Sequence, residues 1–317
     1  MHQHSVFSCH FDDFANRVGK KTGLNDCFLP IISYICSKKQ GAMKVQRIMI
    51  DAGFSCPNRD GTVSTGGCTF CQTESFNPAY CHGSIREQIE AGKRFFGQKY
   101  RNMKYAAYFQ AYSNTFAPIP ILRERYEEAL SCDDIVALVI ATRPDCLSEE
   151  ILSYLSDIKH RGYDVSIEIG IESLYDDTLR RINRGHSAQQ TCEAIRQCAE
   201  AGLEVGGHLI IGLPSETEEM ILHEASLLNA LPLSYLKLHQ LQILKDTKMA
   251  EEWKSRREDF HVTELPAYVS LLKSFLSLLR PDIRIERYAS SAPASLLIAP
   301  RWGIKPAEIA RQITNLV

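Results

Sequence analysis

Short apolar runs alternate with longer amphipathic stretches along most of this chain. Six runs rich in β-branched and other apolar residues predict buried parallel strands, at residues 47–54, 105–112, 135–144, 165–173, 204–214 and 235–244. The stretches between them have apolar positions at helical spacing, at residues 84–96, 120–131, 148–162, 176–202 and 216–231. This alternation predicts an α/β fold, either an open doubly wound sheet or a partial barrel, and periodicity alone does not separate the two.

Residues that favour helix ends mark several of these boundaries. Ser148 precedes two glutamates and predicts a helix start, while Gly162 and Gly202 predict the ends of two helices. No linker or internal repeat divides the core. We therefore expect an N-terminal extension over residues 1–44, a core of six β/α units over 45–250, and a C-terminal segment with helix and strand over 251–317 that packs on the barrel.

Composition narrows the class of protein. The chain has 317 residues, of which 44% are hydrophobic and 23% charged, as in soluble globular enzymes. A formal net charge of -2 gives no global reason to bind nucleic acid or an anionic membrane. The N-terminus lacks the features of a secretory signal, and the longest apolar stretches are too short to span a bilayer. A cytoplasmic location follows, where the eleven cysteines are expected to be thiols or metal ligands.

Three cysteines lie in a glycine-rich loop behind the first predicted strand. Cys56, Cys68 and Cys71 have the spacing C-x11-C-x2-C, and the C-x2-C pair can reach one metal centre from a tight turn. On spacing alone, zinc and an iron–sulfur cluster fit about equally well, and zinc would need Cys81 or His82 as a fourth ligand. The remaining cysteines form no second close cluster and are expected to be core or incidental thiols.

Several blocks in this order resemble the radical S-adenosylmethionine (SAM) superfamily, and within it a bacterial subfamily related to the radical SAM core of the elongator catalytic subunit. The blocks are DAGFSCPNRDGTVSTGGCTFC, AYFQAYSNTFAP, ATRPDCL, INRGH, HLIIGLPSET and LLIAP. The resemblance covers roughly residues 44–300. It implies a partial (β/α)6 barrel, and it favours an iron–sulfur cluster over zinc.

The resemblance also implies the cofactors and the type of enzyme. Cys56, Cys68 and Cys71 would hold three irons of a [4Fe-4S] cluster, and SAM would chelate the fourth iron. One-electron reduction would cleave SAM and release a 5′-deoxyadenosyl radical, with a flavodoxin- or ferredoxin-type protein as the electron donor. The chain is therefore expected to be a radical SAM enzyme, a transferase or an oxidoreductase.

Polar residues at the end of the second run and within the fourth run are candidate cofactor-binding residues, because reacting groups in a parallel barrel come from the C-terminal strand ends. Gln110, Tyr112 and Asn114 lie where related enzymes bind the SAM amino group, although caps of the next turn are an equally good explanation for Gln110 and Asn114. Glu168 and Glu172 share one face of the fourth run, and a carboxylate there suits the ribose hydroxyls of SAM. A buried ion pair between a carboxylate at this position and Arg143 would explain the acidic residues almost equally well.

Two further cofactor contacts follow from the same resemblance. The family pattern implies that Arg184 meets the SAM carboxylate, and Gly185 indicates a break in the helix there. The alternative is a solvated helical arginine. Gly212, at the end of the fifth run, would allow the backbone to approach the adenine closely.

Four residues are candidate substrate contacts. Arg143 and Asp145 follow the third run as a charged pair, which either holds substrate or forms a local ion pair. His239 and Lys245 belong to the sixth run, where His239 could face the barrel. A lone interior histidine is more often a satisfied core residue.

The resemblance to the elongator core favours tRNA as the substrate, with a reaction at an existing C5 side chain of the wobble uridine. Residues 93–105 interleave lysine and arginine with phenylalanine and tyrosine, which suits phosphate contact and base stacking. An ordinary amphipathic helix with a basic face has the same pattern. The alternatives are a radical SAM enzyme for a small molecule or a protein, and a non-enzymatic zinc-binding interaction module.

Overall fold

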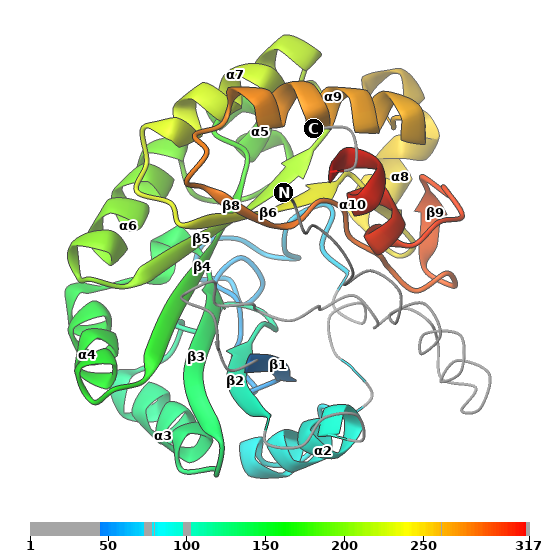
Figure 1. The fold of residues 1–317 in the computed structure, drawn as a ribbon. Coiled ribbons are helices and arrows are strands. Elements are labelled where there is room, and N and C mark those ends of the chain that lie inside the picture. The colour runs from blue at the N-terminus through cyan, green and yellow to red at the C-terminus, as the bar shows by residue number, and fades with distance from the viewer. Residues whose placement is uncertain (1–44, 73–77, 79, 98–102, 261, 315–317) are drawn as a thin grey trace, which may run out of the picture.

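A curled parallel sheet is the framework of the molecule. The computed structural model describes residues 45–314 apart from 73–77, 79, 98–102 and 261, so the expected N-terminal extension over 1–44 lies outside the described residues. Seven parallel strands follow the order β1-β2-β3-β4-β5-β6-β8, which confirms the expected partial barrel (Figure 1). They are β1 (Val45–Ile50), β2 (Lys104–Phe109), β3 (Ile135–Thr142), β4 (Asp164–Glu172), β5 (Glu204–Ile211), β6 (Tyr235–Gln240) and β8 (Arg284–Arg287).

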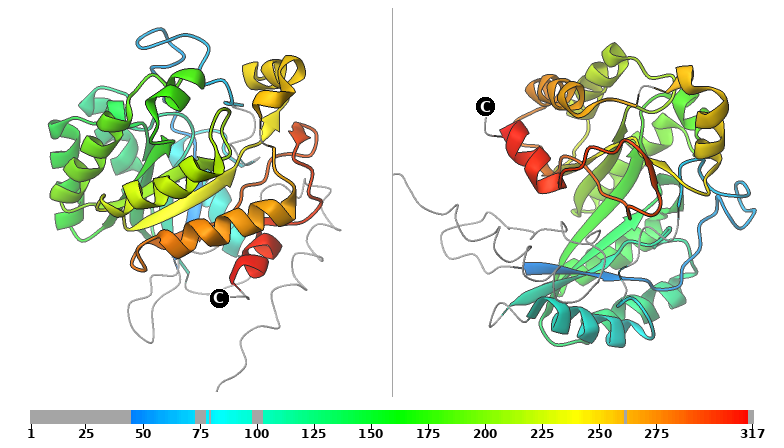
Figure 2. Two further views of the ribbon diagram at one scale, coloured as in Figure 1. Left: turned by 90° about the horizontal axis from the view of Figure 1, so that it is seen from above. Right: turned by 90° about the vertical axis from the view of Figure 1, so that its right-hand side faces the viewer.

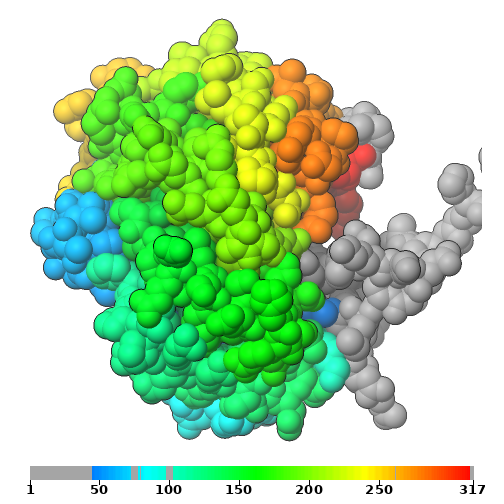
Figure 3. Space-filling view, turned by 90° about the vertical axis from the view of Figure 1, so that its left-hand side faces the viewer, coloured from blue at the N-terminus to red at the C-terminus, as the bar shows by residue number. Residues whose placement is uncertain are grey.

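Helices connect successive strands and cover the outer face of the sheet (Figures 1 and 3). All six residues of β1 are buried, and they include the polar residues Gln46 and Arg47. The connecting helices are α2 (Ile85–Gly97), α3 (Ile119–Leu130), α4 (Glu149–His160), α5 (Asp176–Arg181), α6 (Ala188–Glu200) and α7 (Glu218–Asn229).

The predicted helix ends are confirmed by local geometry. The Ser148 side chain accepts a hydrogen bond from Ile151 N at the start of α4. Gly162 and Gly202 follow α4 and α6 with φ of 99° and 74°, a conformation that favours glycine. The stretch predicted as helical over residues 176–202 is divided into α5 and α6, since Gly185 between them has φ of 78°.

The C-terminal segment adds a seventh strand to the six that the sequence predicts. β8 pairs in parallel with β6, α9 (Leu265–Leu278) packs on α7, and α10 (Pro306–Thr314) packs on α9 (Figure 2). A small antiparallel pair joins β7 (Ile243–Leu244) to β9 (Leu297–Ala299), and α8 (Lys248–Ser255) follows β7. The remaining elements are the short 3-10 helices η3 (Pro144–Cys146) and η4 (Arg257–Asp259). Within the part of the chain that the structure describes, no helix has the length and apolar character to cross a membrane.

Two buried carboxyl groups lie behind the end of β4. Glu216 and Glu224 are 1% and 0% exposed, and Ser173 Oγ lies 2.6 and 3.2 Å from their Oε1 atoms. Leu174 N also donates to Glu224 Oε1 at 2.7 Å, and neither carboxyl has an ion pair within the described residues. Burial raises the pKa of both groups, and the charge of Glu216 adds to the rise for Glu224. The folded protein therefore retains a proton here that the unfolded chain releases.

This pair makes stability depend on pH. Because the folded-state pKa is above the ordinary value of 4.5, the free energy of unfolding should fall as the pH rises from 4.5 through neutrality. Glu224→Gln removes one titrating group, so its loss of stability between about pH 5 and pH 8 should be smaller than that of the wild type by about 1–2 kcal/mol. Urea unfolding at both pH values measures this. Glu219→Gln, at an exposed position of the same helix, is the control and should follow the wild type; parallel pH profiles for Glu224→Gln and the wild type would contradict the prediction.

Candidate active site

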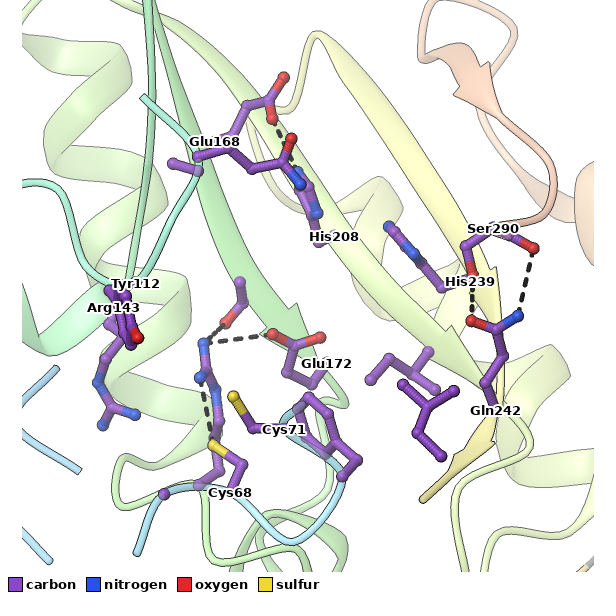
Figure 4. Close-up of a pocket in the computed structure, with 18 of the residues that line it drawn as sticks. Cys68, Cys71, Tyr112, Arg143, Glu168, Glu172, His208, His239, Gln242 and Ser290 are labelled. Atoms are coloured by element: carbon purple, nitrogen blue, oxygen red, sulfur yellow. Dashed lines mark hydrogen bonds and ion pairs between the residues drawn. The ribbon is translucent and has the colours of Figure 1, made fainter. Parts of the chain in front are cut away.

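A cavity lies at the C-terminal ends of the strands. It encloses about 290 Å³ and is lined by the cysteine loop, by the ends of β2 to β6 and by the segment after β8. Figure 4 shows Cys68 and Cys71 in one part of it, and His208 and His239, from β5 and β6, in another. We call these parts the cysteine end, with Cys56, Cys68, Cys71 and Arg184, and the histidine end, with His208, His239, Arg287 and Ser290.

The cysteine loop, residues 56–71, is fixed against the INRGH segment that follows α5. Gly67 N donates to Asn58 O at 2.8 Å, and Thr69 N donates to Ile182 O at 2.9 Å. Asn183, with φ of 53°, donates through its side chain to Gly67 O at 2.9 Å. The first bond closes the loop on itself, and the other two join it to a segment more than a hundred residues away in sequence.

All three predicted cysteine ligands face the cavity. Cys68 is buried, Cys56 and Cys71 are half-buried, and all three are free thiols. Burial raises the pKa of the Cys71 thiol, while its hydrogen bond with Arg59 acts in the opposite direction. Cys81, the alternative fourth zinc ligand, does not line the cavity, since its thiol contacts Met49 O at 3.3 Å.

The side chains around the sulfurs suit an iron–sulfur cluster. Arg184 Nη1 lies 3.6 Å and Asn58 Nδ2 3.4 Å from Cys68 Sγ, so both side chains can donate to this sulfur. In the described part of the chain, no three His, Cys, Asp or Glu side chains converge closely enough to hold one metal ion. Three thiols with hydrogen-bond donors beside one of them are a donor set that suits a [4Fe-4S] cluster, which takes each thiolate on a different iron.

Arg184 forms part of the cavity wall. Its Nη2 donates to Gly170 O at 2.9 Å and pairs with Glu172 at 3.3 Å. A Cβ at residue 170 would lie 2.4 Å from Arg184 Nη2, so glycine is required for the guanidinium to fit. A register shift between Gly170 and Glu172, with φ of 62° at Glu172, marks the point where β4 departs from regular pairing. Glu172 lines the cavity there and is placed to hold Arg184.

Glu168 is fully buried between two cations. Arg47 and Lys237 donate to it at 3.0 and 2.5 Å. Three further donors are Tyr108 at 2.6 Å, His208 at 2.8 Å and Tyr235 at 3.0 Å. Burial by itself raises the pKa of Glu168, but Lys237 and Arg47 outweigh burial and hold it well below the usual range. The carboxylate is therefore ionised and saturated with donors.

The sequence-based alternative that paired this acid with Arg143 is wrong. Arg143 donates to Asp145 through Nε and Nη2 at 2.8 and 2.7 Å, because η3 turns the chain directly after β3. Arg143 lines the cavity but Asp145 does not. The charged pair after β3 is thus a local ion pair at the rim of the cavity.

Some of the other predicted site residues line the cavity, and the rest lie outside it. Gln110, Tyr112 and His239 line the cavity, whereas Asn114, Gly212 and Lys245 do not. Asn114 is fully buried and its Nδ2 donates to Phe109 O at 3.0 Å and Ala141 O at 2.9 Å, so it joins the end of β2 to β3 and does not cap the following helix α3. Tyr112 is 40% exposed with φ of 63°, a strained conformation typical of functional loops. Contact of any of these residues with SAM stays a prediction.

Sequence reasoning did not select several residues that line the cavity: Arg59, His208, Gln242, Arg287 and Ser290. His208 interrupts an apolar strand in the same way as His239, and that shared pattern could have identified it. Arg287 is the last residue of the seventh strand, and Ser290 follows that strand. The sequence predicted only six strands, so a search for polar residues at the ends of predicted strands could not include either residue.

Comparison with known proteins identifies the family. The profile of the Radical SAM superfamily matches residues 60–228, and that of the Radical_SAM C-terminal domain matches residues 233–316. Protein YhcC of Escherichia coli (strain K12) is 39% identical over 263 residues, 82% of this chain and 82% of that protein. The uncharacterized protein YtqA of Bacillus subtilis (strain 168) is 34% identical over 274 residues, 86% of this chain and 84% of that protein.

A solved structure supports the same fold. The archaeal Methanocaldococcus infernus Elp3 with an N-terminal deletion has a TM-score of 0.62 at 19% identity, and the match covers 86% of this chain and 63% of that chain. This chain belongs to the radical SAM superfamily. It is an enzyme whose cofactors are a [4Fe-4S] cluster and SAM.

Proposed function

We propose that Cys56, Cys68 and Cys71 bind the cluster and that SAM binds beside it at the cysteine end of the cavity. The observation that carries this proposal is that one fixed loop presents three thiols to a cavity, with Arg184 against one of them. When bound, the reduced cluster supplies the electron that cleaves SAM to methionine and a 5′-deoxyadenosyl radical. The protein's contribution is to orient SAM and to exclude water.

Three side chains are suited to orient SAM in this cavity. Arg184 remains charged, because its interactions with Glu172 and Cys68 outweigh burial and keep its pKa raised, so it can meet the SAM carboxylate. Gln110 Oε1 is buried and has no partner within the described residues, so it can accept from the SAM amino group. Glu172 can accept from a ribose hydroxyl, whereas Glu168 already has five donors.

For the substrate we propose tRNA, with the reaction at a C5 side chain of the wobble uridine. The similarity of the sequence blocks to the elongator core supports this proposal. At the end of α2, Phe95 is 44% exposed and packs against Phe96 and Tyr80, next to Arg94. Lys93 in the same segment pairs with Glu90 at 2.9 Å, and residues 98–102 lie outside the described residues. A small-molecule or protein substrate is the alternative.

The dependence of SAM cleavage on RNA tests this proposal. Anaerobically reconstituted protein, reduced in the presence of SAM, should form 5′-deoxyadenosine several-fold faster when tRNA from a strain lacking the enzyme is added. Because phosphate contacts release counterions, the stimulation should weaken steeply as the salt concentration rises. Chromatography of the products measures the rate, and mass spectrometry of the tRNA nucleosides identifies the change. Cleavage at the same rate with and without tRNA, together with unchanged nucleosides, would favour the small-molecule or protein alternative.

A further inference from the structure

The arginines that line the cavity differ in whether a carboxylate compensates their charge. Arg143 is paired with Asp145, and Arg184 is paired with Glu172. Arg287 also lines the cavity, yet within the residues that the structure describes it makes no hydrogen bond and no ion pair. A half-buried guanidinium without a partner has lost hydration that nothing in the protein replaces.

Arg287 projects into the barrel beside the two histidines. It is the last residue of β8 and lies in register with Lys237 of β6, whose Nζ reaches Glu168 inside the barrel. Paired residues on neighbouring strands project to the same face of a sheet. In agreement, the charge of Arg287 is, after burial, the largest influence that lowers the pKa of His239.

The acids near Arg287 are already committed to other cations. Glu168 is paired with Arg47 and Lys237, as described above. Glu286, next to Arg287 in β8, is paired with Arg47 at 2.9 Å. No remaining carboxylate among the residues that line the described cavity compensates Arg287, so the histidine end carries an excess of positive charge.

The histidine pair offers a second unfilled hydrogen-bonding position. The rings of His208 and His239 stack with centroids 5.3 Å apart. His208 Nε2 is occupied by Glu168 at 2.8 Å, whereas His239 Nε2 is buried and has no partner within the described part of the chain. A buried ring nitrogen without a partner is costly, and a ligand in the cavity can supply the partner.

The segment behind β8 is held firmly at this end. Gln240 Nε2 donates to Ser290 O at 2.9 Å, and Ser290 N donates to Gln240 Oε1 at 2.8 Å (Figure 4 shows Ser290 with Gln242). Ser290 Oγ also lies 3.3 Å from Gln242 Oε1. This arrangement fixes the wall of the histidine end before any ligand binds, which lowers the entropic cost of binding.

Within the described residues Arg287 has no ion pair and His239 Nε2 has no partner, and from these two observations we infer that the histidine end binds an anionic group of the substrate, a carboxylate or a phosphate. Arg287 supplies the charge and His239 a hydrogen bond. The inference rests on the proposed function only in that the cysteine end is reserved for the cluster and SAM. It holds for an RNA substrate and for a small molecule alike.

Small anions test this site directly. The holoenzyme with its cluster and SAM is titrated with sodium acetate or with sodium phosphate at constant ionic strength, and the midpoint of thermal unfolding is recorded. At about 100 mM, a site with a Kd of about 10 mM should raise the wild-type midpoint by roughly 2 °C, and the rise should grow with the logarithm of the anion concentration. A rise with acetate alone indicates a carboxylate, a rise with phosphate alone indicates a phosphate, and either supports the inference, as does a rise with both.

Variants assign the rise to the histidine end. Arg287→Gln should weaken anion binding about tenfold to a hundredfold and so remove the rise, while Arg287→Lys should retain part of it. Arg301→Gln, at an exposed position of the same C-terminal segment, should behave as the wild type. No rise with either anion, or the same rise in Arg287→Gln as in the wild type, would overturn the inference. If Arg287→Gln does not fold, the wild type, Arg287→Lys and His239→Phe decide the question.

The same samples separate this inference from the proposed function. Iron content and 5′-deoxyadenosine formation by the wild-type protein test the cluster and SAM site. Wild-type protein that lacks iron would contradict the proposed function, and its anion titration would still test the histidine end.

Discussion

Replacement of Cys68 by alanine is expected to abolish reductive cleavage of SAM, with a loss of more than about 1,000-fold in the rate of 5′-deoxyadenosine formation. The physical reason is that a cluster with three protein ligands cannot be retained by two thiolates at an otherwise open cavity. Iron and sulfide analysis and the visible absorbance of the anaerobically reconstituted protein should show the loss of the cluster.

Cys81→Ala is the matched control for this prediction. Cys81 is a buried thiol close to the loop in sequence, but it contacts Met49 O and does not line the cavity. Its replacement should leave the iron content and the rate of SAM cleavage unchanged. Iron and activity retained in Cys68→Ala would contradict the assignment of this cysteine as a ligand, and loss of metal from both variants would instead favour the four-ligand zinc site.

Replacement of Glu168 by glutamine is expected to lower the free energy of unfolding by about 3–5 kcal/mol. The acid is completely buried, and its removal leaves the charge of Arg47 in the interior with Glu286 as its remaining acid partner in the described residues. Burial already lowers the pKa of Lys237 to about 7, so without Glu168 this lysine loses its proton and its strong ion pair. Urea unfolding of the wild type and of Glu168→Gln at neutral pH measures the difference.

An exposed ion pair provides the control. Glu127 and Arg161 have side chains that are 42% and 46% exposed, so Glu127→Gln should cost less than about 1 kcal/mol. If Glu168→Gln lowered the free energy of unfolding by a similarly small amount, the prediction would be wrong. Arg47 and Lys237 would then lose their charge or become hydrated without destabilising the fold. The same variant should also perturb the histidine end, because His208 donates to Glu168.

Much of the fold was predictable because its signals are local. Apolar runs gave the six strands, and Ser148, Gly162 and Gly202 gave helix ends that the backbone geometry confirms. The sequence did not predict that a strand of the C-terminal segment joins the sheet as its seventh strand. β8 is only four residues long, each of them half-buried, and it reads RIER, so no apolar run marks it.

The site was predictable to the extent that a motif encodes it. The three cysteines were found from their spacing and their place behind the first strand, and the structure brings them to one cavity. The partners of Glu168 were not found. Arg47 lies 121 residues away from it in sequence and Lys237 69 residues away, and Arg143, the partner considered instead, turns toward Asp145.

The sequence by itself determined the order of strands and helices, the loop with three thiols and the family to which the chain belongs. These depend on residue types at short spacing, where each signal is independent of the distant chain. Only the tertiary structure decided which charges neutralise one another and which remain available. That outcome depends on the curl and register of the sheet, which place Arg287 in register with Lys237 and near the histidines, while Glu168 and Glu286 pair with other cations.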